Sequence, residues 1–101
     1  MTAYPSAAER ATGAMTVREV QLLHLVMLAV ELDVLERSCT LALNRFDLPV
    51  LYVPEAAGKL KIKAELRGDQ WMYTWGRGPN RRTPVNGEAA RRIAAMAAAR
   101  P

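Results

Sequence analysis

The sequence has one cysteine, one histidine, and no glycine or proline from residue 14 to residue 48. A lone cysteine excludes an internal disulfide, and we expect a reduced, cytoplasmic setting. One histidine without a cysteine pair does not supply the ligands of a typical zinc site. The longest apolar run, residues 22–30, is short for a membrane span. We therefore expect no metal, no cofactor and no membrane contact.

Groups that carry out catalysis are equally scarce. Ser38 and Cys39 have no base near them in the sequence, and no pair of carboxylates stands at a catalytic spacing. His24 lies inside the apolar run, where a hydrogen-bonded interface histidine is the expected role. Gly76 and Gly78 do not precede a helix, so they indicate a turn rather than a phosphate loop. We expect a protein that is not an enzyme.

Charge is divided unevenly along the chain. Residues 1–50 carry four basic and six acidic side chains, whereas residues 51–101 carry ten basic and four acidic ones. The net charge of +4 therefore comes from the second half. Such a division predicts two surfaces with different tasks, although lysine and arginine also serve simply as a solvated face.

A long helix is predicted to begin at Thr16, which with Glu19 forms a capping box. Nothing interrupts the helical pattern before residue 47, so we expect roughly 30 residues and about 45 Å of helix. The helix has two apolar stripes with helical spacing, where an ordinary surface helix has one. The first consists of Leu25, Leu28, Leu32, Leu35, Cys39, Ala42 and Phe46, and the second of Val20, Leu23, Met27, Val30 and Val34, with Leu41 one heptad on.

The second stripe predicts a homodimer. A seven-residue strand is only about 23 Å long, so a short sheet covers part of such a helix and leaves the rest overhanging. An antiparallel, two-fold pairing would bury Val20, Leu23, Met27, Val30 and Val34 against a second copy. The alternatives are a helix that breaks near residues 31–33 and folds back, or a last helix that covers the stripe.

Three short strands are predicted after the helix, over residues 50–53, 59–67 and 70–76. Gly68 and Asp69 form a two-residue turn, which pairs Leu66 with Trp71 and Ala64 with Tyr73. Polar residues then share the opposite face of this hairpin, and a shift of one residue would destroy that division.

Aromatic and basic residues therefore lie on opposite faces of the expected sheet. Trp71, Tyr73 and Trp75 share a face with apolar residues, so core positions are favoured over a platform for stacking bases. The other face and the following loop carry the candidate contacts for an anionic partner, which are Lys59, Lys61, Lys63, Arg67, Arg77, Arg81 and Arg82. An acidic protein is the favoured partner, and a nucleic acid is the alternative.

The chain closes with an alanine-rich helix over residues 87–99, with Asn86 as its N-cap. The prediction is thus an α+β fold: a long N-terminal helix, a three-stranded antiparallel meander and a short C-terminal helix. Residues 1–15 form a flexible tail, and residues 16–101 form a single α-β-β-β-α domain.

The Trp71–Gly76 segment, the basic loop after it, and the run Glu88-Ala89-Ala90-Arg91-Arg92-Ile93-Ala94 resemble those of small actinobacterial proteins. Those proteins have an N-terminal helix, a short sheet that ends in a tryptophan-rich strand, and an alanine-rich last helix. They are often found beside helix-turn-helix regulators. The resemblance covers roughly residues 30–99 and implies an accessory or regulatory role, without supplying site residues. Together the patterns predict a regulatory protein–protein interaction module that forms a homodimer; the alternative is a nucleic-acid-binding protein.

Overall fold

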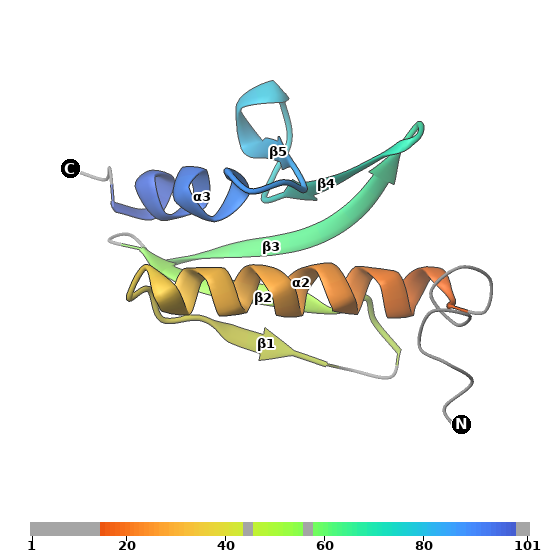
Figure 1. The fold of residues 1–101 in the computed structure, drawn as a ribbon, viewed down its shortest axis with the longest axis horizontal. Helices are drawn as coiled ribbons and strands as arrows, with labels where there is room; N and C mark the ends of the chain where they lie inside the picture. The colour runs from red at the N-terminus through yellow and green to blue at the C-terminus, as the bar shows by residue number, and fades with distance from the viewer. Residues whose placement is uncertain (1–14, 44–45, 56–57, 99–101) are drawn as a thin grey trace.

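The computed structural model describes residues 15–43, 46–55 and 58–98, so the predicted tail lies almost wholly outside the described residues. The fold is α+β, as predicted, but its sheet has five strands instead of three. The strands form an antiparallel meander in the order β1-β2-β3-β4-β5 (Figure 1). Its elements are α2 (Val17–Val34), β1 (Thr40–Ala42), β2 (Val50–Glu55), β3 (Gly58–Arg67), β4 (Gln70–Thr74), the 3-10 turn η2 (Pro79–Arg81), β5 (Arg82–Pro84) and α3 (Ala89–Ala98).

Helix α2 begins where predicted but ends early. Thr16 accepts a hydrogen bond from the Glu19 amide, and the Glu19 side chain accepts one from the Thr16 amide, which completes the capping box. The predicted 30-residue helix is wrong, because α2 has 18 residues, or about 27 Å. Its surplus apolar surface therefore cannot come from overhanging length.

The helix ends without glycine or proline because Glu36 adopts the left-handed conformation, with φ of 60°. This conformation lets the Arg37 amide donate to the Leu32 carbonyl (2.8 Å) and the Glu36 amide donate to the Asp33 carbonyl (2.9 Å). These two bonds form a Schellman motif, which usually has glycine at the position of Glu36. Because glutamate takes the place of glycine here, the sequence did not indicate that the helix ends at this point.

The two strands that the sequence did not predict, β1 and β5, have three residues each and form the edges of the sheet. Strand β1 contains Thr40 and Ala42, and pairs with β2 through Leu41 and Leu51. Cys39, Ala42 and Phe46 therefore do not continue a helical stripe, and Phe46 is strongly exposed. The signal for β1 was the run of weak helix formers Ser38-Cys39-Thr40, and for β5 the β-branched Thr83.

The predicted β3–β4 hairpin is confirmed pair by pair. Leu66 lies opposite Trp71, Ala64 opposite Tyr73, and Lys63 opposite Thr74. Gly68, with φ of 62°, supplies the positive φ that the tight turn requires. The core positions predicted for the aromatic strand are also confirmed, since Tyr73 and Trp75 are buried and Trp71 is half-buried.

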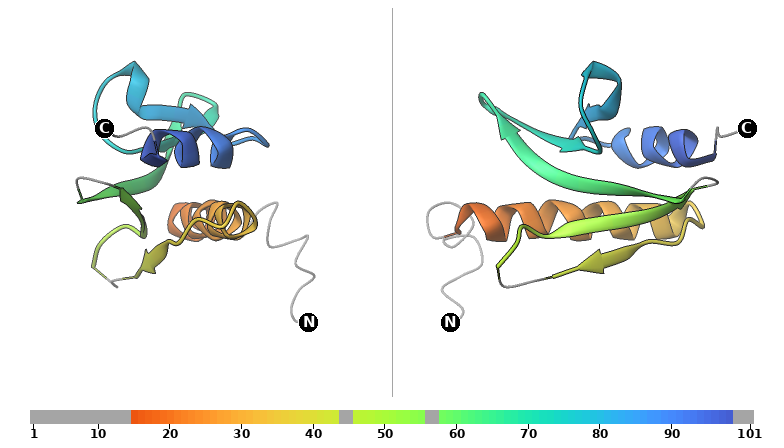
Figure 2. Two further views of the ribbon diagram at one scale, coloured as in Figure 1. Left: turned by 90° about the vertical axis from the view of Figure 1, so that its left-hand side faces the viewer. Right: turned by 180° about the vertical axis from the view of Figure 1, so that it is seen from behind.

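Both helices cover the same face of the curved sheet, side by side (Figure 2). The core forms between them and the sheet, and α3 contributes mainly small alanines, which let it pack closely. The predicted start at residue 87 is wrong, because α3 begins at Ala89; the Asn86 side chain accepts a hydrogen bond from the Glu88 amide (2.8 Å) in the turn before the helix. The buried core residues are Leu25, Leu28, Leu32, Leu51, Val53, Leu60, Ile62, Ala64, Tyr73, Trp75, Ala89, Ala90, Ile93 and Ala97.

Candidate interaction surfaces

The second predicted stripe lies on the side of α2 that faces away from the sheet. Leu23 is 44% exposed, Met27 47%, Val30 60% and Val34 76%, and Val20 is half-buried. Val26 adds to the same face and is 40% exposed. At 100° per residue, the directions of these six side chains fall within about a third of a turn. We call Val20, Leu23, Val26, Met27, Val30 and Val34 the outer stripe.

A small notch adjoins one end of the outer stripe. It has a volume of about 210 Å³ and lies between the C-terminal turns of α2 and the start of α3. Val30 and Val34 line it from α2, Ala90 from α3, and Arg91 and Glu31 supply the charged groups of its lining. An aliphatic side chain fits the apolar part of this notch, because alanine leaves room on the α3 side.

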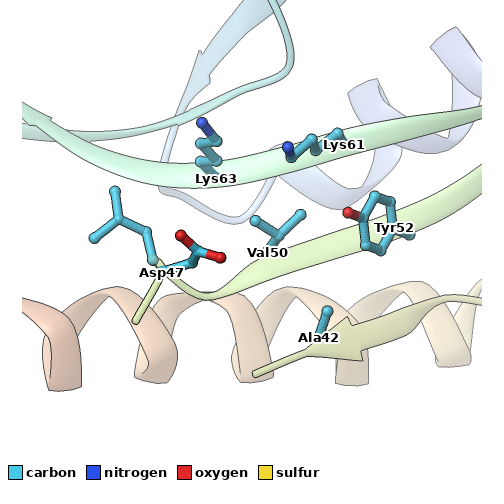
Figure 3. Close-up of a pocket in the computed structure, with 7 residues that line it drawn as sticks. Ala42, Asp47, Val50, Tyr52, Lys61 and Lys63 are labelled. Atoms are coloured by element: carbon cyan, nitrogen blue, oxygen red, sulfur yellow. The ribbon is translucent and has the colours of Figure 1, made fainter. Parts of the chain in front are cut away.

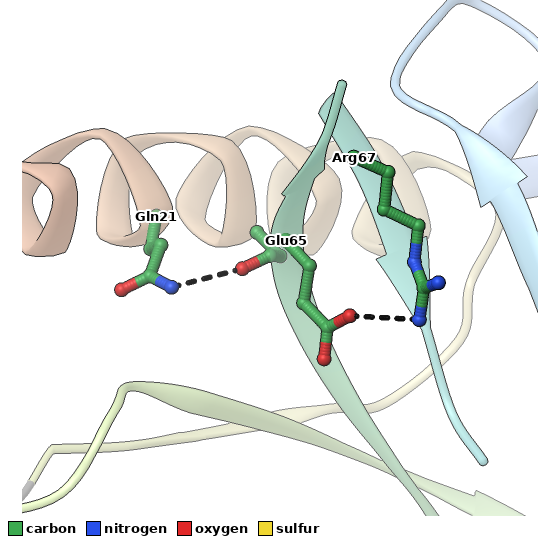
Figure 4. Close-up of polar contacts among 4 residues, drawn as sticks. Gln21, Glu65 and Arg67 are labelled. Carbon is green, nitrogen blue, oxygen red and sulfur yellow. Dashed lines mark hydrogen bonds and ion pairs between the residues drawn. The ribbon is translucent and has the colours of Figure 1, made fainter. Parts of the chain in front are cut away.

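Polar side chains fix α2 to the sheet along one seam. The Gln21 amide donates to the Ala64 carbonyl (3.1 Å; Figure 4), and the Tyr73 hydroxyl donates to the His24 carbonyl (2.7 Å). The His24 ring lies 5.1 Å from the Trp71 ring, measured between centroids. Burial lowers the pKa of His24 and raises that of Tyr73, since it disfavours the charged form of each. The interface role predicted for His24 is untested; within one copy, its ring lies at the α2–β4 seam.

The face of the sheet opposite the helices is basic. Cross-strand neighbours share a face, so the pairs Lys61–Tyr52, Lys63–Thr74 and Thr74–Arg82 place these side chains on that face. We call this surface the open face. Lys63, Thr74 and Arg82 form one row across three strands, which the sequence did not show because β5 was not predicted.

Two adjoining cavities hollow the open face, and Lys61 and Lys63 line both. The cavity over β1, β2 and β3 has a volume of about 430 Å³ (Figure 3). Its remaining lining residues are Ala42, Asp47, Leu48, Val50 and Tyr52. The cavity over β3 and β4 has a volume of about 390 Å³. Its remaining lining residues are Glu65, Arg67, Thr74, Trp75, Gly76 and Arg77.

The seven predicted basic contacts do not all meet. The two cavities are lined by Lys61, Lys63, Arg67 and Arg77. Arg82 lines neither cavity, but it lies on the same face, in the cross-strand row with Thr74 and Lys63. Arg81 instead lies in a separate pocket with the core-side residues Leu60 and Trp75 and with Met96 of α3. The Arg81 side chain packs over Gly76, where an added Cβ would come within 2.6 Å of the Arg81 Cδ.

Two of these cations already have neighbours within the chain. The Lys59 ammonium lies 4.5 Å from the centre of the Tyr52 ring, in a cation–π contact. Arg67 forms an ion pair with Glu65 at 3.2 Å (Figure 4). Both groups of the ion pair are largely exposed, so the pair adds little stability and leaves Arg67 able to exchange partners.

Sequence reasoning missed the apolar part of the first cavity, where Leu48 and Val50 lie beside the lysines. The signal was present in part, because alternation over residues 50–53 places Val50 and Tyr52 on one face. It could not show that this face coincides with the lysine face of β3, since that depends on the register between β2 and β3.

The described residues contain neither a metal-ligand cluster nor a membrane-spanning helix. Within residues 15–43, 46–55 and 58–98, no group of three or more His, Cys, Asp or Glu side chains is placed to hold a metal ion. None of the helices in these segments is long and apolar enough to cross a membrane. Burial and the nearby Asp33 raise the pKa of the Cys39 thiol, which disfavours the reactive thiolate.

No family model, curated protein or solved structure matches the chain. The features of the chain that bear on its function are therefore its two surfaces, the outer stripe of α2 and the open face of the sheet.

Proposed function

We propose that the protein is a non-enzymatic protein–protein interaction module that forms a homodimer through the outer stripe of α2. One observation carries the proposal: the face of α2 that points away from the core is apolar along almost its whole length and stays exposed in the single chain. Contiguous apolar surface of this kind marks an interaction site. An accessory or regulatory role fits a small module with this surface.

The spacing of the stripe favours an antiparallel pair. Val20 and Val34 lie equally far in sequence from Met27, so a two-fold axis beside Met27 places Val20 of one copy against Val34 of the other. A parallel pair would instead bring together the acidic residues Glu31 and Asp33 of the last turn of α2 and Glu36 just after it. Antiparallel helix dipoles also attract one another.

The notch gives this pairing a place for a protruding side chain. In the antiparallel register, Leu23 of the partner faces the segment from Val30 to Val34. Its side chain then fills the notch beside Ala90, so α3 contributes to the interface as well as α2. An interface that includes both helices has better shape complementarity than two smooth helix faces.

The test is the mass of the protein in solution, measured by sedimentation at several micromolar concentrations. We expect twice the 11.2 kDa of one chain for the wild type. Leu23→Glu and Met27→Glu should raise the dissociation constant more than about tenfold, because each places two carboxylates in the apolar seam.

Two matched variants serve as controls. Leu66 and Met96 are also exposed apolar residues, at 52% and 39%, but neither belongs to the outer stripe. Leu66→Glu and Met96→Glu should therefore leave the dimer intact. A wild type of monomer mass throughout, or equal loss of the dimer in all four variants, would contradict the proposal.

A further inference from the structure

The open face carries a second proposal, which does not depend on the dimer. The cavities above Lys61 and Lys63 lie on the side of the sheet that neither helix covers, opposite the core and α2. They adjoin at Lys61 and Lys63, which line both, and together they extend over β1, β2, β3 and β4. We call the two cavities together the basic trough.

The trough combines positive charge with an aliphatic floor. Lys61, Lys63, Arg67 and Arg77 face Asp47 and Glu65, and Glu65 is already paired with Arg67. The apolar part lies on the β1–β2 side and consists of Ala42, Leu48 and Val50, with Tyr52 next to them. A ligand that fits both parts has carboxylates along one flank and aliphatic side chains along another.

We propose that the basic trough binds an acidic amphipathic helix of another protein. Lysines two residues apart on a strand stand about 7 Å apart, and carboxylates four residues apart on a helix stand about 6 Å apart along its axis. Adjacent lysines of β3 thus match an i, i+4 pair of glutamates. The leucines beside that pair rest on Leu48, which is 48% exposed, at the edge of the buried Val50; this is the helix-in-groove mode of recognition.

A nucleic acid fits the trough less well. Single-strand binders stack bases on exposed aromatic rings, but Tyr73 lies buried on the helix side of this sheet, and Trp75, although it lines the cavity over β3 and β4, is only 8% exposed. The aromatic ring on the β1–β2 side of the trough is Tyr52, and Lys59 lies over that ring. Aliphatic residues on the floor also find little apolar surface on a sugar–phosphate chain.

The test compares three fluorescent probes of equal net charge by anisotropy. The first is a peptide of glutamate, alanine and leucine with its leucines on one helical face, and the second has the same composition in scrambled order. The third is an oligothymidine. We expect the amphipathic peptide to bind at least about tenfold more tightly than either of the others. Equal binding of the scrambled peptide would overturn the proposal, and tighter binding of oligothymidine would do so in favour of a nucleic-acid site.

The trough is tested by charge reversal. Lys61→Glu with Lys63→Glu should weaken binding of the amphipathic peptide by more than about tenfold. Arg91→Glu with Arg92→Glu makes the same change in net charge on exposed residues of α3 and should change binding less than about threefold. Equal losses in both double variants would mean a non-specific charge effect and would overturn the proposal.

Two further measurements separate this proposal from folding and from the dimer. Lys61→Gln with Lys63→Gln removes the charges without introducing repulsion and should still weaken binding, with an unchanged circular dichroism spectrum. Leu23→Ala, on the outer stripe, should leave peptide binding unchanged even where it weakens the dimer. Loss of binding in Leu23→Ala would place the peptide on α2 and contradict the trough.

Discussion

The inner and outer faces of α2 are built from the same kinds of side chain, yet the fold treats them differently. Leu25, Leu28 and Leu32 are fully buried against the sheet and α3, whereas Leu23 and Met27 remain nearly half exposed. Helical periodicity identifies both faces as apolar. It cannot say which face has a partner within the chain, because that depends on where the sheet and α3 lie.

The largest expected effect is a loss of unfolding free energy, and it differs between a leucine on the inner face and a leucine on the outer face of α2. Leu25→Ala should lower the free energy of unfolding by about 2–5 kcal/mol, because it leaves a cavity in the core. Leu23→Ala should cost less than about 1 kcal/mol at low protein concentration, where the monomer dominates. Urea unfolding of both variants checks this. Equal costs at low concentration would mean that Leu23 is covered within its own chain.

The next effect concerns the hydrogen bond that fixes the inner side of α2 to β4. Tyr73→Phe removes the donor to the His24 carbonyl and should cost about 0.5–1.5 kcal/mol of unfolding free energy. Tyr52→Phe is the matched control on the open face, and it should cost less because its ring contact with Lys59 remains. Thermal and urea unfolding of the two variants give the comparison. A larger cost for Tyr52→Phe would contradict the assigned seam.

A smaller effect is a gain of stability, and it concerns Glu36, the residue that terminates α2. Glu36 occupies a left-handed position that glycine adopts without strain, so Glu36→Gly should raise the unfolding free energy by about 0.5–1 kcal/mol. Glu36→Ala keeps the strain and serves as the control. A loss of stability in the glycine variant would argue against the Schellman ending and in favour of a longer helix.

The smallest effect is a pH dependence at the seam between the two faces. Burial lowers the folded-state pKa of His24 below its unfolded value of 6.5, so the unfolded chain binds more protons when the pH falls below about 6.5. Stability is therefore full above that pH and declines as the pH falls toward the folded-state pKa. Unfolding measured from pH 7.5 to 5 should show this decline in the wild type and a flatter profile in His24→Gln. Parallel profiles would exclude His24 as its source.

The β3–β4 hairpin and α2 also show how far the sequence alone could go. Alternation and a glycine turn fix the hairpin locally, so Leu66 opposite Trp71 followed from the sequence. The end of α2 depends on a strained Glu36, and the edge strands β1 and β5 have only three residues each. Neither leaves a periodic pattern long enough to recognise.

For the two candidate surfaces, too, the sequence predicts only the parts that lie within one helix or one strand. The residues of the outer stripe and the lysines of β3 follow from helical and strand periodicity. The notch beside Ala90 and the floor of Leu48 and Val50 join segments that are distant in sequence. Only packing and the register between β2 and β3 bring them together.

The most direct measurement is disulfide cross-linking of single-cysteine variants in a Cys39→Ala background. An antiparallel pair centred on Met27 places that residue against its mate, whereas two copies of Val34 stand about 21 Å apart along the helix axes, too far for a disulfide. Met27→Cys should therefore cross-link with itself, and Val34→Cys only with Val20→Cys. No cross-link at position 27, or equally fast self-linking at position 34, would contradict a second copy covering the outer stripe in this register.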